Sequence, residues 1–415
     1  MYKSVNVMDF GAKANGRTDD AHAIQKALDS GADEVIIPRG RYKIGHTLYI
    51  GSNTRITAHP YAHIRLANNA CTKRGDFLLA NKNHNDNEHR NENITVKGGI
   101  WDGNNATNSK PKCLFSETAN SGAIFSFKNV NKLTLSTLTL SEAGGYHARF
   151  CRINGFLFEN IHFCSLHPVN NNDGIHLNGF CENGIIRNLY ANTPGSPSDD
   201  MVALNADDIM TRPEALDMEC GYIRNIVIDG LHASKCQSFV RILSINSDIT
   251  NISISNVTGG FWGMAVNMDA ARYCMTPIID PDSPEFREGV GRVENVHLSH
   301  FRVHSFNDSK NASYISLESN MYNFTVDDFV REEELEASHN VKTLRLLNIS
   351  PSHVTLKGAT NEACAKKFAK GKEETLVETE NELGKTVYSS DFDTDMYDVR
   401  LYENGSFERL EINRL

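Results

Sequence analysis

The sequence predicts an all-β chain folded as a right-handed, single-stranded parallel β-helix with a short N-terminal capping helix. Three observations favour this fold: short alternating apolar runs recur along most of the chain, an Asn precedes most of them, and apolar residues at helical spacing are rare. Runs of this kind stack on the equivalent runs of neighbouring repeats. That stacking builds long parallel sheets.

The repeated element consists of an Asn, an alternating run, a small or polar bend and a second short run. The shorter spacings between successive Asn residues, 23 to 29 residues, fit one coil, and the longer ones, 38 to 44 residues, fit a coil with an inserted loop. We expect the Asn side chains to stack at the coil corners and to hydrogen-bond to one another. The repeats begin at Asn93, Asn131, Asn154, Asn183, Asn225, Asn251 and Asn295.

The N-terminal helix is predicted over residues 21–28, where apolar residues follow a helical spacing. Thr18, Asp19 and Asp20 precede it as candidate N-caps, and Gly31 follows its end. An uncovered terminal coil would leave a strand edge open to aggregation. We therefore expect the helix to cover the first coil.

The chain is expected to form a single domain, because no long linker or change of composition divides it. Residues 1–50 would form the N-terminal cap and first coil, 51–350 the main solenoid, and 351–415 the last coils and a C-terminal cap. Polar, Pro or Gly residues interrupt the strand pattern where we expect inserted loops that wall a binding groove. These loops are residues 81–91, 104–118, 208–220, 273–289 and 307–336.

Composition excludes several classes of protein. The chain has 415 residues, 40% of them hydrophobic, and 42 basic against 52 acidic residues, so disorder and a nucleic-acid partner are disfavoured. No apolar run is long enough to cross a membrane, and no export signal precedes residue 10, which favours a cytoplasmic protein. The nine cysteines include no CxxC pair, so we expect neither a disulfide framework nor a zinc site, and no metal or cofactor.

Three aspartates are the candidate catalytic residues. Asp173 lies in the turn Asn171-Asn172-Asp173-Gly174, and Asp199 and Asp200 follow one coil later. Matched positions of adjacent coils are about 4.8 Å apart, so the three carboxylates could converge. Acetal hydrolysis uses such a cluster, with one carboxylic acid protonating the leaving oxygen and a carboxylate activating water. Taken alone, the same pattern is more often a solvated corner or an Asx-turn.

The same residues resemble glycoside hydrolase family 28, the polygalacturonase-like enzymes of the pectate-lyase-like β-helix superfamily. That family carries Asn-Thr-Asp-Gly, Asp-Asp before an apolar strand, Gly-His-Gly and Arg-Ile-Lys on successive coils. Asn171–Gly174 is similar to the first motif and Asp199–Leu204 to the second. The opening Asn6–Lys13, with Thr18–Asp20, is similar to the N-terminal cap of pectate-lyase-like proteins. The resemblance extends roughly over residues 4 to 300.

The resemblance implies a role for each aspartate: Asp199 would be the general acid, while Asp173 and Asp200 would hold the attacking water in an inverting hydrolysis. The two later motifs are replaced by Cys236-Gln237-Ser238 and Ala265-Val266-Asn267. In polygalacturonases the basic pair of the last motif grips the galacturonate carboxylate. Its loss makes polygalacturonan a doubtful substrate.

Arg241 is a candidate replacement for the lost basic pair. It lies four residues after Gln237, and with a period of two along a strand both side chains should face the groove. A guanidinium there could bind a carboxylate bidentately, or could simply lie over the solenoid surface. The full set of substrate-binding candidates is His147, His176, Gln237, Arg241 and Asn267.

Three functions remain open from the sequence. The first is an inverting glycoside hydrolase that cleaves an α-linked, pectin-type acidic or deoxy sugar from an oligosaccharide. The second is a β-helix polysaccharide lyase or epimerase, which would depend on calcium. The third is a non-catalytic, tailspike-like carbohydrate-binding β-helix. A carbohydrate is the expected partner in all three, and the sequence makes no prediction of the oligomeric state.

Overall fold

The structure, a computed structural model, describes most of the chain up to residue 332 and six short strands beyond it. The described ranges are residues 2–86, 88–109, 120–207, 217–244, 247–268, 292–306, 313–318 and 321–332, followed by 342–347, 354–356, 377–380, 386–389, 399–401 and 407–409. The expected loop at 273–289 and most of the expected C-terminal cap lie outside the described residues.

Strands make up nearly all of the regular structure. Helices within the described ranges are η1 (Val7–Phe10), α1 (Ala21–Leu28) and α2 (Asn105–Asn108). The strands are β1 (Ser4–Asn6), β2 (Asn15–Asp19), β3 (Glu34–Ile37), β4 (Gly40–Ile44), β5 (Leu48–Ile50), β6 (Arg55–Ala58), β7 (Ala62–Leu66), β8 (Leu79–Asn81), β9 (Asn91–Lys97), β10 (Ile100–Asp102), β11 (Phe125–Ser141), β12 (Ala148–Cys164), β13 (Ile175–Leu177), β14 (Cys181–Ala191), β15 (Asp200–Asn205), β16 (Ile223–Leu243), β17 (Ile249–Met268), β18 (Val293–Ser305), β19 (Ser313–Glu318), β20 (Met321–Arg331), β21 (Lys342–Leu347), β22 (Val354–Leu356), β23 (Val377–Glu380), β24 (Thr386–Ser389), β25 (Val399–Leu401) and β26 (Phe407–Arg409).

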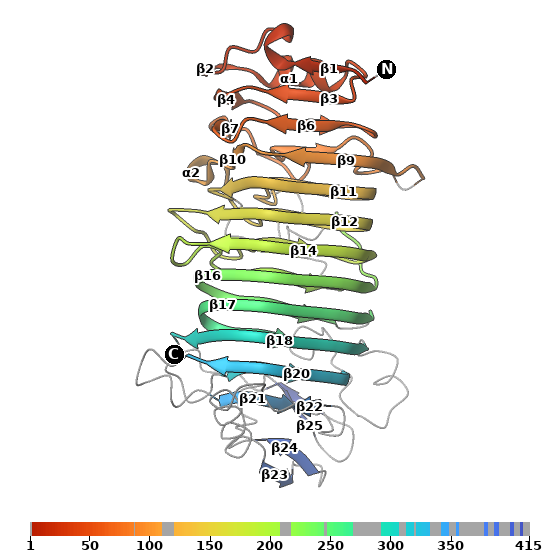
Figure 1. The fold of residues 1–415 in the computed structure, drawn as a ribbon, viewed down its shortest axis with the longest axis vertical. Coiled ribbons are helices and arrows are strands. Elements are labelled where there is room, and N and C mark those ends of the chain that lie inside the picture. Colours follow the sequence, from red (N-terminus) through yellow and green to blue (C-terminus); the bar gives the residue numbers. More distant parts are fainter. Residues whose placement is uncertain are drawn as a thin grey trace.

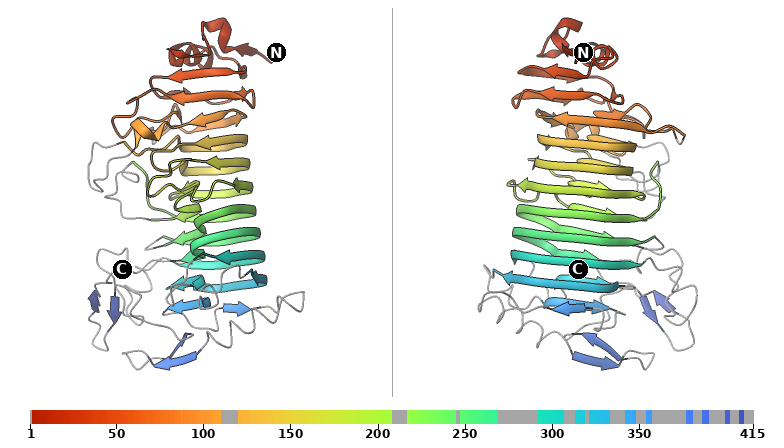
Figure 2. Two further views of the ribbon diagram at one scale, coloured as in Figure 1. Left: turned by 90° about the vertical axis from the view of Figure 1, so that its left-hand side faces the viewer. Right: turned by 45° about the vertical axis from the view of Figure 1, so that its right-hand side comes forward.

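Strands β1 to β22 hydrogen-bond into one continuous 22-stranded sheet in which neighbouring coils run parallel. Figure 1 shows the coils stacked along one axis from the N-terminus downward, and Figure 2 shows the stack from two other sides. This parallel, nearly all-β solenoid confirms the predicted fold class. Its handedness stays a prediction, as does the division into a single domain.

Each complete coil has three faces, which we name from one coil. Face A contains residues 184–187 of β14, face B contains residues 189–191 of the same strand, and face C contains β15. The register continues across coils, so that Ile185 lies between Leu157 and Val227 on face A. On face C, Ala203 lies between His176 and Arg241.

Asn side chains form the predicted ladder at the corner before face A. Asn183, Asn225, Asn251 and Asn295 have φ between 57° and 59°, a left-handed conformation that Asn tolerates better than most residues. Each Nδ2 donates to the Oδ1 of the preceding Asn, at 3.0 Å from Asn225, 2.9 Å from Asn251 and 3.0 Å from Asn295. The prediction is off by one residue in two earlier coils, where Lys132 and Gly155 occupy the left-handed position instead of Asn131 and Asn154.

The interior of the solenoid is apolar and rich in aromatic rings. The Phe127 and Phe150 rings stack in adjacent coils with centroids 6.2 Å apart, and Phe150 also stacks on Phe158 at 4.4 Å. All three rings are fully buried. Inward-facing residues of all three faces thus share one core, and polar residues that point outward are available for a site.

Helix α1 lies at the N-terminal end of the stack beside β1 (Figure 1) and buries Ile24 and Leu28. Of the expected N-caps, Asp19 accepts a hydrogen bond from the Ala21 N–H at 3.0 Å. Asp20 does not cap the helix, because its carboxylate accepts the N–H groups of Lys13 and Ala14 at 2.6 and 3.0 Å. The role of α1 as a cap stays a prediction.

The C-terminal part departs from the expected pattern in two places. The loop expected over residues 307–336 is wrong in large part, because β19 and β20 lie within it and continue the parallel ladders. Beyond residue 351, β23 pairs with β24 and β25 pairs with β26, both antiparallel. Among the described residues, no helix is long and apolar enough to span a membrane.

Candidate functional site

The three predicted aspartates lie together at the turn from face B to face C. Asp173 is in the turn between β12 and β13, Asp199 immediately precedes β15, and Asp200 begins it. One carboxylate oxygen from each residue lies within 4.8 Å of the other two. The residues are only 3%, 8% and 1% exposed, respectively, so the cluster is not a solvated corner.

Backbone hydrogen bonds fix the Asp173 turn to its neighbouring coils. The Asp173 carbonyl accepts the backbone N–H of His147 at 2.8 Å, and the Gly174 N–H donates to the Asp200 carbonyl at 2.9 Å. Gly174 has no room for a side chain, because a Cβ there would lie 2.4 Å from the Met201 carbonyl oxygen. The spacing of the carboxylates therefore follows from the strand register.

His176 is directly coupled to Asp173. Its Nδ1 lies 2.5 Å from Asp173 Oδ2, and its ring stacks on Tyr146 with centroids 4.0 Å apart and planes at 12°. The amide nitrogen of Asn178 lies 3.4 Å from Nε2 on the other side of the ring. Because the Asn178 amide nitrogen is a donor, Nε2 accepts, and the neutral ring then donates its Nδ1 proton to Asp173.

Asp200 is the most buried carboxylate of the cluster. Within the described chain neither of its oxygens has a hydrogen-bond partner, and Nη1 of Arg241 lies 3.8 Å from Oδ2. Burial, followed by the negative charge of Asp199, raises the pKa of Asp200 well above its usual value, against the opposing charge of Arg241. A carboxyl group in this setting retains its proton more readily than an exposed one.

Three of the substrate-binding candidates, Gln237, Arg241 and Asn267, lie on β16 and β17, the strands that follow the aspartates along face C. Arg241 is the register partner of Ala203 and of Asn267, so the two side chains lie in one outward row of face C. Both residues are 7% exposed. Gln237 is half-buried, and its backbone N–H donates to the Asp199 carbonyl at 3.2 Å.

His147, also expected to bind substrate, is fully buried beneath the Asp173 turn. Its Nδ1 lies 2.8 Å from the Asp173 carbonyl oxygen, and its Nε2 lies 3.2 Å from Ser165 Oγ. Burial lowers the pKa of His147 to about 4, so the ring is neutral. The structure corrects the expectation: His147 has no exposed surface for a ligand and instead holds the turn that carries Asp173.

Sequence reasoning missed an ion-pair network on the N-terminal side of the cluster. Arg149, the register partner of His176, is fully buried and binds Asp217 through Nη1 and Nη2 at 2.7 and 2.6 Å. Burial alone would raise the pKa of Asp217, but the Arg149 charge and hydrogen bonds lower it. Glu219 pairs with Lys128 at 2.8 Å and with Arg152 at 2.7 Å. These ion pairs connect residues 217–219 to Lys128 of β11 and to Arg149 and Arg152 of β12.

The three aspartates are suited to two kinds of chemistry. Carboxyl groups with different proton affinities can act as acid and base toward an acetal. Three carboxylate oxygens within 4.8 Å are also a donor set that hard divalent cations such as Ca²⁺ accept.

Comparison with known proteins gives a family match at the N-terminal end. Residues 4–106 match the model of the family described as rhamnogalacturonase A/epimerase, pectate lyase-like. Over 304 residues, 67% of this chain and 64% of the other, the chain is 25% identical to the polygalacturonase QRT2 of Arabidopsis thaliana. Together these matches confirm the resemblance to the polygalacturonase-like group of the pectate-lyase-like superfamily.

Two further similarities extend over a short segment or concern the fold alone. The chain is 35% identical over 100 residues to the pre-neck appendage protein of Bacillus phage B103, which is 24% of this chain but only 11% of the phage protein. A solved 1,3-α-1,4-β-D-galactose-4-sulfate-3,6-anhydro-D-galactose-2-sulfate 4 galactohydrolase superposes with a TM-score of 0.56 at 16% identity, covering 86% of this chain and 90% of the hydrolase.

Proposed function

We propose that the protein is a glycoside hydrolase that cleaves an α-linked, pectin-type acidic or deoxy sugar from an oligosaccharide by an inverting acid/base mechanism. The observation that supports it is the buried cluster of Asp173, Asp199 and Asp200, whose oxygens lie within 4.8 Å of one another on adjacent coils. The similarity to a polygalacturonase over 67% of the chain favours the same reaction class. A cytoplasmic location belongs to this proposal.

The proposed roles are those that the resemblance to the family 28 enzymes implies. Asp199, the most exposed of the three, donates a proton to the leaving glycosidic oxygen as its bond to the anomeric carbon breaks. Asp173 and Asp200 orient a water molecule, and the group that is ionised accepts its proton as the water oxygen attacks the anomeric carbon. The raised pKa of Asp200 leaves Asp173 as the better base, and His176 supports its charge with a hydrogen bond.

The spacing bears on the stereochemistry. Inverting enzymes hold their acid and base carboxyl groups roughly 6.5 to 9.5 Å apart, which leaves room for water. The nearest oxygens of this cluster are closer, within 4.8 Å, which suits a water molecule that two of the carboxylates share and that attacks the anomeric carbon at the margin of the cluster. Proton NMR of the first product anomer tests this directly: an anomer of retained configuration contradicts the inverting mechanism.

The substrate is proposed to differ from polygalacturonan. The Arg241 guanidinium lies beside Asp200 and its side chain is only 9% exposed, so it cannot replace an exposed basic pair without moving. Polygalacturonan should therefore be a poor substrate. If Arg241 does bind a sugar carboxylate, Arg241→Ala should lower kcat/KM for an acidic oligosaccharide by roughly 10- to 150-fold and leave a neutral one nearly unchanged.

The decisive experiment assays wild type, Asp199→Asn and Asp173→Asn on a panel of pectic oligosaccharides. We expect hydrolysis by wild type and a loss of at least about 100-fold in each variant. Asp229→Asn, on face A, is the matched control and should retain full activity. Binding of the oligosaccharides without turnover by wild type would contradict the hydrolase and support a binding protein.

Two alternatives are separated in the same assay. The matched segment of the phage appendage protein favours a non-catalytic structural role for at least the N-terminal coils. A lyase or epimerase with a cation held by the three aspartates would lose activity with a chelator, and a lyase would give an unsaturated product. The proposed hydrolase should instead keep its activity with a chelator and give no unsaturated product.

A further inference from the structure

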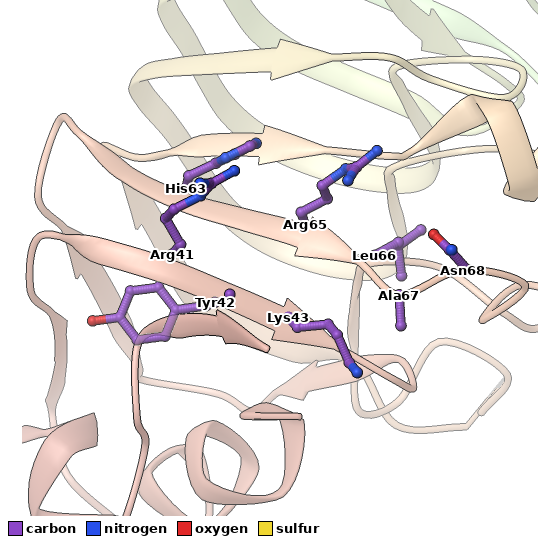
Figure 3. A pocket seen from close by; sticks show the side chains of 9 residues that line it. Arg41, Tyr42, Lys43, His63, Arg65, Leu66, Ala67 and Asn68 are labelled. Atoms are coloured by element: carbon purple, nitrogen blue, oxygen red, sulfur yellow. The ribbon is translucent and has the colours of Figure 1, made fainter. Parts of the chain in front are cut away.

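A cleft on face B of the N-terminal coils contains an array of basic side chains. It encloses about 360 Å³ and is lined by the side chains drawn in Figure 3. Arg41 and Lys43 come from β4, and His63 and Arg65 come from β7. Arg41 is the register partner of His63, and Lys43 is the partner of Arg65, so the four form two adjacent pairs on neighbouring strands.

Only part of this positive charge is neutralised. Asp102 on β10 accepts from His63 Nε2 at 2.9 Å and from Arg65 Nε at 3.1 Å, and Arg65 also donates to Asn104 Oδ1 at 2.7 Å. The charged groups of Arg41 and Lys43 make no hydrogen bond or ion pair with any residue that the structure describes. Two cations in the cleft are thus available to an anion.

Neither Gly16 nor Asp19, both on the neighbouring strand β2, neutralises the charges of Arg41 and Lys43. A Cβ at Gly16 would lie 3.3 Å from the Arg41 Cβ and 3.7 Å from its Nε, so the side chain packs over a glycine whose φ is +71°. Asp19, the register partner of Lys43, directs Oδ1 to the N–H groups of Ala21 and Gly45, each at 3.0 Å. Figure 3 shows Arg41 and Lys43 on one strand and His63 and Arg65 on the neighbouring strand.

We propose that this cleft binds an anionic group, a sulfate or a carboxylate, of an acidic glycan. Guanidinium and ammonium groups bind such oxyanions through charge-assisted hydrogen bonds, and the polar side chain of Asn68 at the rim can bond sugar hydroxyls. A nucleic acid is disfavoured because Tyr42, the one tyrosine of the lining, is buried with its hydroxyl donating to Pro38 and presents no exposed ring face to a base.

The cleft is separate from the aspartate cluster. Strands β10, β11 and β12 lie between β7 and the Asp173 turn in the face B ladder, which puts the two sites several strand spacings of about 4.8 Å apart along the axis. Binding at the cleft does not depend on the proposed hydrolase activity. It is measured by binding alone, so the two proposals can fail independently.

The test is calorimetric titration of the full chain with a sulfated oligosaccharide, an oligogalacturonate, a neutral oligosaccharide of the same length and inorganic sulfate. We expect one or both charged sugars to bind more tightly than the neutral sugar and than sulfate alone, and binding to weaken with added salt. Arg41→Gln/Lys43→Gln should lower that affinity by about 10-fold or more.

The matched control, Arg55→Gln/Lys97→Gln, removes two positive charges from face A, on β6 and β9, and should leave the affinity unchanged. An equal loss in both double variants, or no loss in either, overturns the proposal. So does tighter binding of a single-stranded oligonucleotide than of either charged sugar, or binding of inorganic sulfate with no gain from the sugar. If the double variant lacks a cooperative thermal transition, Lys43→Gln alone decides, with an expected loss of at least about 3-fold.

Discussion

Nδ1 of His176 lies 2.5 Å from Oδ2 of Asp173, and the His176 imidazole also stacks on the Tyr146 ring. The two residues are three apart in sequence and lie on opposite sides of Gly174–Ile175, where the turn meets β13. A fully enclosed carboxylate is stabilised most by a donor that cannot move. His176 therefore supplies Asp173 with a hydrogen-bond donor held in a fixed position.

The first prediction follows from that contact. His176→Ala removes a hydrogen bond to a charged group, about 1.5 to 3 kcal/mol, and should lower kcat by roughly 10- to 150-fold with a small change in KM. Tyr146→Phe keeps the ring that stacks on the imidazole and should retain most of the activity. His162→Ala, an imidazole on face B, serves as the control. An unchanged kcat in His176→Ala would show that Asp173 does not depend on it.

The second prediction concerns Asp200 and pH. Its pKa is raised in the folded protein, so the protonated group stabilises the fold fully below its unfolded pKa, about 3.9, and that stability is lost as pH rises through the folded pKa. Asp200→Asn should therefore increase the free energy of unfolding at pH 8, by about 1.4 kcal/mol for each unit of pKa shift, with the gain disappearing near pH 4. Urea unfolding at both pH values measures it, and an Asp200→Asn variant no more stable than wild type at pH 8 would contradict the prediction.

The third prediction tests the buried tether. Arg149→Met leaves Asp217 without its partner, and removing one member of a buried pair costs about 3 to 5 kcal/mol. The exposed pair of Arg187 and Glu159, with an N–O distance of 2.6 Å, is the control, and Arg187→Met should cost less than about 1 kcal/mol. Similar losses of unfolding free energy in the two variants would contradict a structural role for residues 217–219.

The fourth prediction separates backbone strain from hydrogen bonding in the Asn ladder. Asn251→Ala loses two side-chain hydrogen bonds and places Ala at φ +59°, a conformation that costs about 1 to 2 kcal/mol. Asn251→Gly loses the same bonds without that strain. Chemical unfolding should therefore rank wild type above Gly and Gly above Ala, and an Ala variant as stable as the Gly variant would remove the strain argument.

The sequence predicted what recurs along the chain and missed what joins distant segments. The Asn corners and the convergence of Asp173 with Asp199 and Asp200 follow from a repeat, so one coil predicts the next. The pair of Arg149 and Asp217 joins residues 68 positions apart and follows no repeat. The burial of His147 was not predictable in this way. It depends on how the turn that carries Asp173 folds over the imidazole, and the alternating pattern of the strands does not encode that turn.

The corner ladder also bears on how the molecule responds to a pulling force. Each Asn is tied to the coil before it and to the coil after it, and each coil contacts mainly its two neighbours. Tension applied at one end loads only the outermost interface, so coils should peel away in succession with a similar force at every step. An optical trap would record this as a regular staircase of extensions, with the length of each step set by the number of residues in the released coil.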